Sequence, residues 1–136
     1  MIHNPAWLDD LIANVRIILA VANSLAVLEE TGGTILTDGT EQIVYVNETP
    51  AGVFRPMCVK IDCTNQTAID TIVLRTYYRI EPAGAYVLQD TLTFAGLVSP
   101  ELIDIELEPN RYGIRVTIEH TVSSQIEYVW EVCYKI

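Results

Sequence analysis

Residues 102–120, LIDIELEPNRYGIRVTIEH, carry the clearest structural signal in the chain. Apolar and polar side chains alternate in both halves of this stretch, and the turn residues Pro109–Gly113 separate the halves. The apolar rows are Ile103, Ile105 and Leu107, then Ile114, Val116 and Ile118; the first is interleaved with an acidic ladder of Asp104, Glu106 and Glu108. Because alternate side chains of a strand point to opposite faces, this pattern predicts antiparallel strands with one buried face and one solvated face.

The chain on either side of this stretch follows the same pattern from about Thr34 to the end. Short runs rich in Val, Ile, Thr and Tyr are separated by turn residues every 8–15 positions. The predicted strands are Thr34–Thr37, Gln42–Asn47, Val53–Cys63, Thr71–Ile80, Tyr86–Ala95, Leu102–Glu108, Ile114–Thr121 and Glu127–Ile136. We therefore predict a mainly β fold, an antiparallel β-sandwich of about eight strands. The sequence does not distinguish a jelly roll from an immunoglobulin-like topology.

One amphipathic helix is predicted before the sandwich. Asn4 can cap it, Pro5 suits its first turn, and Gly32 with Gly33 is expected to end it. Its apolar side chains recur at heptad spacing, at Leu8, Leu11, Val15, Ile18, Ala22 and Leu25. The sequence thus divides into a helix for oligomerisation or attachment, residues 1–31, and a β-sandwich domain, residues 32–136.

The apolar stripe is too wide for a helix surrounded by water. It must pack on the chain's own sheet, on copies of itself or on a neighbouring protein, and we favour the last two over intrachain packing. Half of the 136 residues are hydrophobic, which also suggests a surface shared with another subunit. We therefore expect protein partners and a homo-oligomer, with the six heptad residues as the interface.

Net charge excludes one class of partner. Eight basic residues stand against 18 acidic ones, which gives a formal net charge of −10, and no basic cluster is present. Affinity for a phosphate backbone comes from lysine and arginine displacing counterions. We therefore expect no nucleic acid partner.

A signal peptide and a membrane span are both disfavoured. The apolar run Ile17–Ala22 is preceded by Asp9 and Asp10 rather than by a cationic segment. Polar residues, namely Asn14, Arg16, Asn23 and Ser24, interrupt the helix short of about 18 apolar positions.

No arrangement of residues predicts catalysis, a cofactor or a metal ion. His120 continues an inward-facing row near a strand end, where a structural histidine bonded to a loop carbonyl is expected. The acidic ladder is interpreted as a solvated face, since its carboxylates are about 6.5–7 Å apart. Half of the basic residues, namely Arg75, Arg79, Arg111 and Arg115, are expected to pair with this ladder across strands.

Three cysteines are expected to act as small apolar residues, Cys58, Cys63 and Cys133. A Cys58–Cys133 bridge remains open if their strands pair. The tyrosines and Trp130 are expected in the core or at a protein interface rather than as a platform for sugars.

The predicted architecture, a short N-terminal helix followed by a compact acidic sandwich, resembles that of small structural proteins of tailed viruses, especially capsid decoration proteins. The runs Thr31–Thr34, Gly39–Gln42 and Glu106–Gly113 also resemble such virion proteins of phages and archaeal viruses. The resemblance implies a non-enzymatic protein on the capsid or tail surface, held on a major capsid or tail protein through its N-terminal helix and a sandwich edge. The alternative is a carbohydrate- or receptor-binding sandwich with contacts from the loops 50–54, 82–86 and 110–112.

Overall fold

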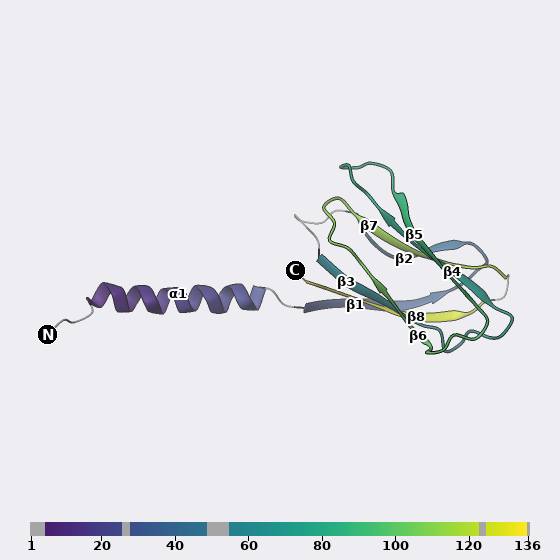
Figure 1. Cartoon of the computed structure of the whole chain (residues 1–136), viewed down its shortest axis with the longest axis horizontal. Coiled ribbons are helices and arrows are strands. Elements are labelled where there is room, and N and C mark those ends of the chain that lie inside the picture. The colour runs from purple at the N-terminus through teal and green to yellow at the C-terminus, as the bar shows by residue number, and fades with distance from the viewer. Residues whose placement is uncertain (1–4, 26–27, 49–54, 123–124, 136) are drawn as a thin grey trace.

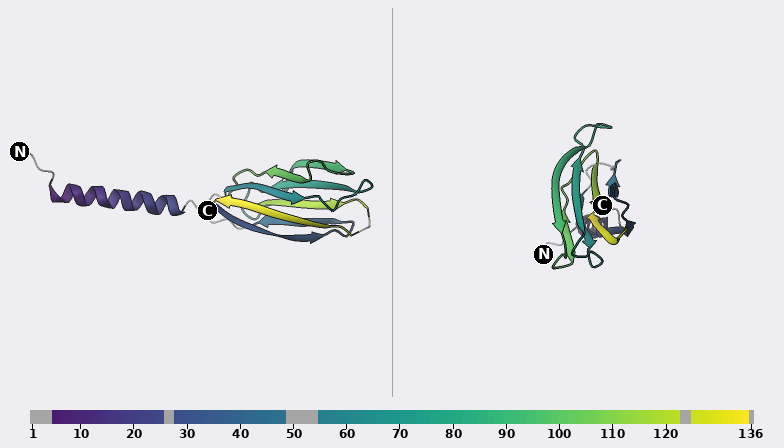
Figure 2. Two further views of the ribbon diagram at one scale, coloured as in Figure 1. Left: turned by 90° about the horizontal axis from the view of Figure 1, so that it is seen from below. Right: turned by 90° about the vertical axis from the view of Figure 1, so that its right-hand side faces the viewer.

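The structure, a computed structural model, describes residues 5–25, 28–48, 55–122 and 125–135. A single helix precedes eight strands, which pack as two sheets face to face (Figures 1 and 2). The elements are α1 (Ala6–Leu25), β1 (Leu28–Leu36), β2 (Glu41–Asn47), β3 (Arg55–Asp62), β4 (Thr71–Tyr78), β5 (Val87–Ala95), β6 (Leu102–Glu106), β7 (Ile114–His120) and β8 (Glu127–Lys135). The predicted eight-stranded sandwich is confirmed.

The order of strands identifies the topology. Sheet A has the order β1-β8-β3-β6 and sheet B the order β2-β7-β4-β5. Antiparallel pairs are nested within one another, with β4 on β5, β3 on β6, β2 on β7 and β1 on β8. Successive nested pairs fall alternately in the two sheets, which is the arrangement of a jelly roll. The structure therefore selects the jelly roll over the immunoglobulin-like alternative.

The core lies between the two sheets and is built by the alternating rows. Both apolar rows of residues 102–120 point inward, the first from β6 in sheet A and the second from β7 in sheet B, so the predicted inner faces are confirmed. The buried apolar residues are Val44, Val59, Ile61, Cys63, Ile72, Leu74, Ile103, Ile105, Leu107, Ile114, Val116, Ile118, Tyr128 and Val132. Burial of a Val, Ile or Leu side chain contributes about 1.5–3 kcal/mol, so this layer holds the two sheets together.

The predicted end of the helix was wrong. α1 ends at Leu25, and Gly32 and Gly33 lie inside β1, opposite Glu131 and Trp130 of β8. The physical reason is close packing, because a Cβ on Gly32 would lie 2.7 Å from the Trp130 carbonyl oxygen. Glycine here lets the edge strand β1 approach β8, whereas the sequence suggested a helix C-cap.

α1 projects from the end of the sandwich that also carries the C-terminus (Figures 1 and 2). Among the described residues, the elements whose backbones lie closest together are neighbouring strands of one sheet. Among the described residues, no helix has the length and apolar character needed to cross a membrane.

Candidate assembly interface

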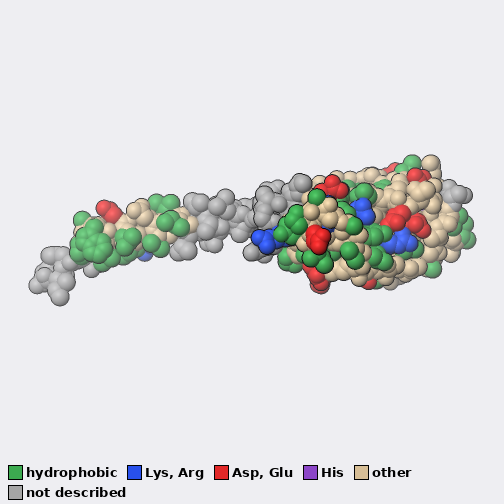
Figure 3. Space-filling model, turned by 90° about the horizontal axis from the view of Figure 1, so that it is seen from above, with side chains coloured by type: hydrophobic (Ala, Val, Ile, Leu, Met, Phe, Trp, Pro, Cys, Tyr) green, Lys and Arg blue, Asp and Glu red, His purple; other side chains and the backbone are tan. Residues whose placement is uncertain are grey.

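The surface of α1 is the most conspicuous apolar feature outside the core. Six of its large apolar side chains are between 42% and 65% exposed, namely Trp7, Leu11, Ile12, Val15, Ile17 and Ile18. Figure 3 shows mostly hydrophobic side chains on the visible face of α1, with few charged ones between them. A contiguous apolar surface of this kind marks an interaction site in a soluble protein.

The structure describes the side chains of four of the six residues in the predicted heptad stripe. Leu11, Val15 and Ile18 are exposed and Leu8 is half-buried. Ala22 and Leu25 belong to α1, but their side chains lie outside the described residues. Whether these six residues form an interface stays a prediction.

Three exposed apolar residues of α1 lie outside the six predicted interface positions, namely Trp7, Ile12 and Ile17. Trp7 precedes Leu11 by one helical turn, so an i, i+4 spacing could have included it, although it is not a heptad position of the predicted stripe. Ile17 lies about 100° around the helix from Ile18, outside the stripe. The apolar surface is therefore broader than the heptad pattern predicted.

The 20-residue helix α1 depends on its surroundings for much of its stability, because helices in proteins are held mainly by packing of an apolar face. In Figure 1 the described strands lie beyond one end of α1 and not along its sides.

The outer face of sheet A carries the acidic ladder. Asp104 and Glu106 of β6 and Glu108 beyond it are exposed, as the solvated-face interpretation predicted. Lys60 on the neighbouring strand β3 lies 3.9 Å from Asp104, at the limit of an ion pair. Such exposed pairs contribute about 0–1 kcal/mol, so this face is stabilised little by its charges.

The predicted pairing of the arginines with this ladder was wrong for Arg75, which pairs with the acids of its own sheet. Arg75 of β4 lies 3.6 Å from Glu41 and 3.4 Å from Glu119, both on the outer face of sheet B. Glu41 also accepts hydrogen bonds from the hydroxyls of Thr117 and Tyr77. These hydrogen bonds and the nearby guanidinium groups lower the pKa of Glu41 against the opposing effect of burial.

The other three arginines that were expected to pair with the ladder, Arg79, Arg111 and Arg115, lie over aromatic rings. Arg115 lies 4.7 Å from the centre of the Tyr77 ring and 4.5 Å from that of Tyr86, and Arg79 covers Tyr86 at 4.9 Å. Arg111 lies 5.8 Å from the centre of the Tyr112 ring. Cation–π contacts explain why these tyrosines tolerate a position outside the core.

A buried polar cluster joins the loop after β3 to the end of β7. His120 Nε2 lies 2.9 Å from Asp70 Oδ1, with the two side chains 0% and 2% exposed. The predicted structural role of His120 fits, but the partner of Nε2 is the Asp70 carboxylate instead of a carbonyl. The second carboxylate oxygen accepts hydrogen bonds from the backbone and hydroxyl of Thr67, both at 2.7 Å.

The carboxylate of Asp70 is kept ionised by its partners. Burial favours the neutral form, but the hydrogen bonds from Thr67 and the contact with His120 outweigh it and lower the pKa of Asp70. Gln66 continues the cluster by donating to two backbone carbonyls and accepting from Tyr128 at 3.0 Å. A histidine–carboxylate pair this enclosed cannot meet a substrate, so we assign it to stability.

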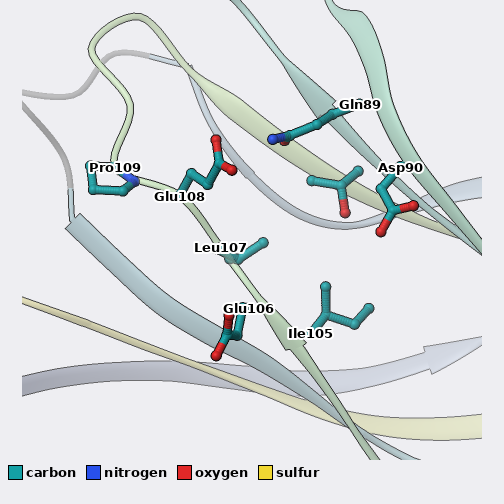
Figure 4. A pocket seen from close by; sticks show the side chains of 8 residues that line it. Gln89, Asp90, Ile105, Glu106, Leu107, Glu108 and Pro109 are labelled. Atoms are coloured by element: carbon teal, nitrogen blue, oxygen red, sulfur yellow. The ribbon is translucent and has the colours of Figure 1, made fainter.

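A groove opens where the edge strands β5 and β6 leave the sandwich unclosed (Figure 4). Its volume is about 440 Å³, and it is lined by Thr76, Gln89, Asp90, Ile105, Glu106, Leu107, Glu108 and Pro109. Figure 4 shows the carboxylates on both sides of it, and its lining contains no base paired with a nucleophile. In the part of the chain that the structure describes, no group of three His, Cys, Asp or Glu side chains is placed to hold a metal ion.

Comparisons with known proteins give similarity of shape only. No protein-family model matches the chain, and no curated protein matches it in sequence. The crystal structure of PirA is 13% identical, with a TM-score of 0.47 over 79% of this chain and 93% of that chain. The infectious bursal disease virus VP2 subviral particle is 10% identical, with a TM-score of 0.45 over 81% of this chain and 32% of that one.

A third solved structure is from the Bacillus endospore appendages, described as a novel family of disulfide-linked pili. It is 19% identical, with a TM-score of 0.45 over 81% of this chain and 88% of that chain.

Proposed function

We propose that this chain is a non-enzymatic structural protein of a virion, a capsid decoration or minor capsid protein. Copies associate through α1, and α1 with a sandwich edge attaches them to the protein lattice of a capsid or tail. The observation that carries the proposal is the exposed apolar surface of α1, which the chain's own sandwich leaves uncovered. The jelly roll behind it is a rigid unit, and this fold recurs in viral capsid domains.

Energetics favour an interface that uses several of these side chains at once. Burying one large apolar side chain contributes about 1.5–3 kcal/mol. Association costs about 4–15 kcal/mol in lost freedom, so the apolar surface of α1 must be buried largely together. A substitution at one central position should therefore weaken assembly strongly.

The sugar-binding alternative predicts exposed aromatic rings, because sugars stack on them. Among the described residues, Tyr128 is fully buried, and Tyr78 and Trp130 pack against the core. Tyr77 and Tyr86 are covered by arginine. These positions favour the structural role.

Ile18→Asp is expected to weaken self-association about 10-fold to 100-fold and to leave the sandwich folded. Ile18 is the most exposed large apolar side chain in the described part of α1, and burying a carboxylate there without a partner is costly. Sedimentation velocity over a concentration series measures the shift.

Ala13→Asp is the matched control, because it adds the same charge as Ile18→Asp at another exposed position of α1. Ala13 lies about 140° around the helix from Ile18. It is expected to associate like the wild-type chain. Equal association of the two variants would contradict a role for the predicted face.

A further inference from the structure

Two cysteines face each other across the centre of sheet A. Cys58 of β3 is the register partner of Cys133 of β8, and both strands are interior to the sheet. Their neighbours along each strand, Val59 and Val132, are fully buried in the core. Because side chains alternate, Cys58 and Cys133 share the outer face of the sheet, where both are half-buried.

The register itself satisfies the geometry of a disulfide. Directly opposite residues of an antiparallel pair have their Cα atoms about 4.5–5.5 Å apart. A disulfide requires about 4.4–6.8 Å between Cα atoms. The register shifts between Pro56 and Cys58, so the cysteine pair lies directly beside an irregularity of β3. The spacing of paired positions still brings the two side chains within reach of a bond. Neither cysteine is part of a disulfide in this structure, and the Cys133 thiol donates a hydrogen bond to the Glu131 carboxylate.

We propose that Cys58 and Cys133 are an oxidation site that forms an intrachain disulfide between β3 and β8. The oxidant is a small disulfide of the oxidised glutathione class. One cysteine thiolate attacks it, forms a mixed disulfide and releases one thiolate. The second cysteine thiolate then attacks the mixed disulfide, so the Cys58–Cys133 bond forms and a second thiolate leaves. The two protein thiols lose two protons and two electrons, and the small disulfide is reduced to two thiols.

The surroundings set the rate and the selectivity of this reaction. Burial and the nearby Asp104 raise the pKa of Cys58, partly offset by Lys60. Oxidation is therefore slow at neutral pH and accelerates as the pH rises. Cys63 is 1% exposed, and burial raises its pKa to about 11, so it is excluded from the exchange.

The bond would secure the strands that carry α1. β1 follows α1 in the chain and is an edge strand whose only neighbour in the described sheet is β8. β8 in turn is held to the sheet by β3. A force applied to α1 is transmitted through β1 and β8 to β3. The Cys58–Cys133 bond adds a covalent link between β8 and β3. This inference rests on the sheet alone and is independent of the proposed function.

The test uses the full chain, first reduced and then incubated with oxidised glutathione at about pH 8.5, near the pKa of an ordinary thiol. Trypsin separates the cysteines, since Lys60 lies between Cys58 and Cys63, and Arg75 lies between Cys63 and Cys133. Mass spectrometry without reductant is expected to find the Cys58 and Cys133 peptides joined, in a chain that migrates as a monomer on a denaturing gel. The melting temperature is expected to rise by about 10 °C, because the bond closes a long loop in the unfolded chain.

Two variants complete the test. Cys63→Ala is expected to keep the joined peptides, and Cys58→Ser is expected to lose them together with the rise in melting temperature. Peptides joined through Cys63, bonds only between chains, or two free thiols after full exchange would each overturn the proposal.

Discussion

Asp70→Ala is expected to lower the free energy of unfolding by about 3–5 kcal/mol, the largest effect of any single substitution proposed for this chain. The alanine removes the partner of His120 Nε2, which is fully buried, and the acceptor for both donors of Thr67, whose hydrogen bonds are partly buried. A buried donor without an acceptor costs more than the hydrogen bond contributed. Urea denaturation at one fixed protein concentration measures the change, because association adds to apparent stability.

Asp90→Ala is the matched control for this effect. Asp90 is exposed on β5, and its carboxylate accepts a hydrogen bond from the backbone of the next residue, Thr91. Surface substitutions of this kind usually change stability by less than about 0.5 kcal/mol. If Asp70→Ala unfolds as late in urea as Asp90→Ala, the buried cluster does not stabilise the sandwich in the way described.

The pH dependence of stability follows from the same carboxylates. The pKa of Asp70 and that of Glu41 are lowered in the folded chain, so both contribute stability above about pH 4, the usual pKa of a carboxyl in the unfolded chain. That stability is lost as the pH falls through the lower, folded pKa values, because the unfolded chain binds the protons first. Unfolding at pH 3 and at pH 6 measures the loss. Asp70→Asn should show a smaller difference between the two conditions than the wild-type chain, and an equal difference would exclude Asp70 as a source.

Gly113→Ala is expected to cost about 2–4 kcal/mol and to lower the melting temperature by roughly 5–15 °C. Gly113 has a backbone φ of +146°, which residues other than glycine rarely adopt. Its added Cβ would also lie 2.7 Å from the Tyr86 hydroxyl and 2.9 Å from the backbone oxygen of Asn47. The hydroxyl can move away, but the backbone of β2 cannot do so without breaking its pairing.

Gly33→Ala is the control, because a Cβ there meets the Trp130 ring at 3.5 Å, an ordinary contact. Circular dichroism melts of the two variants compare them directly. A Gly33→Ala chain that melts below Gly113→Ala would show that the turn before β7 is not strained.

The strands could be predicted from the sequence because their signal is local. Alternation of apolar and polar residues, as in 102–120, depends on burial of one face, and strands were predicted at β2 to β8, whereas most of β1 was assigned to the helix and its end. The order of the strands could not be predicted, since the nested pairing joins segments as distant as β1 and β8. Gly32 was assigned to a helix end because its real reason, a close approach to the Trp130 carbonyl, depends on that distant partner.

The polar contacts were harder to predict for the same reason. The Asp70–His120 pair joins residues 50 positions apart, and nothing near either residue in the sequence identifies the other. Arg75 was expected to pair with the ladder on β6, but the jelly roll places β6 in sheet A and Arg75 in sheet B. The apolar stripe of α1, by contrast, is a local pattern, and its helix could be predicted apart from its end.

The molar mass of the full-length wild-type chain in solution tests the central claim most directly. Light scattering coupled to size exclusion, over a range of loading concentrations, is expected to give a mass that is a multiple of 15.2 kDa. A mass of one chain at every concentration, with the apolar side chains of α1 protected from solvent by the chain's own sandwich, would contradict assembly through this helix.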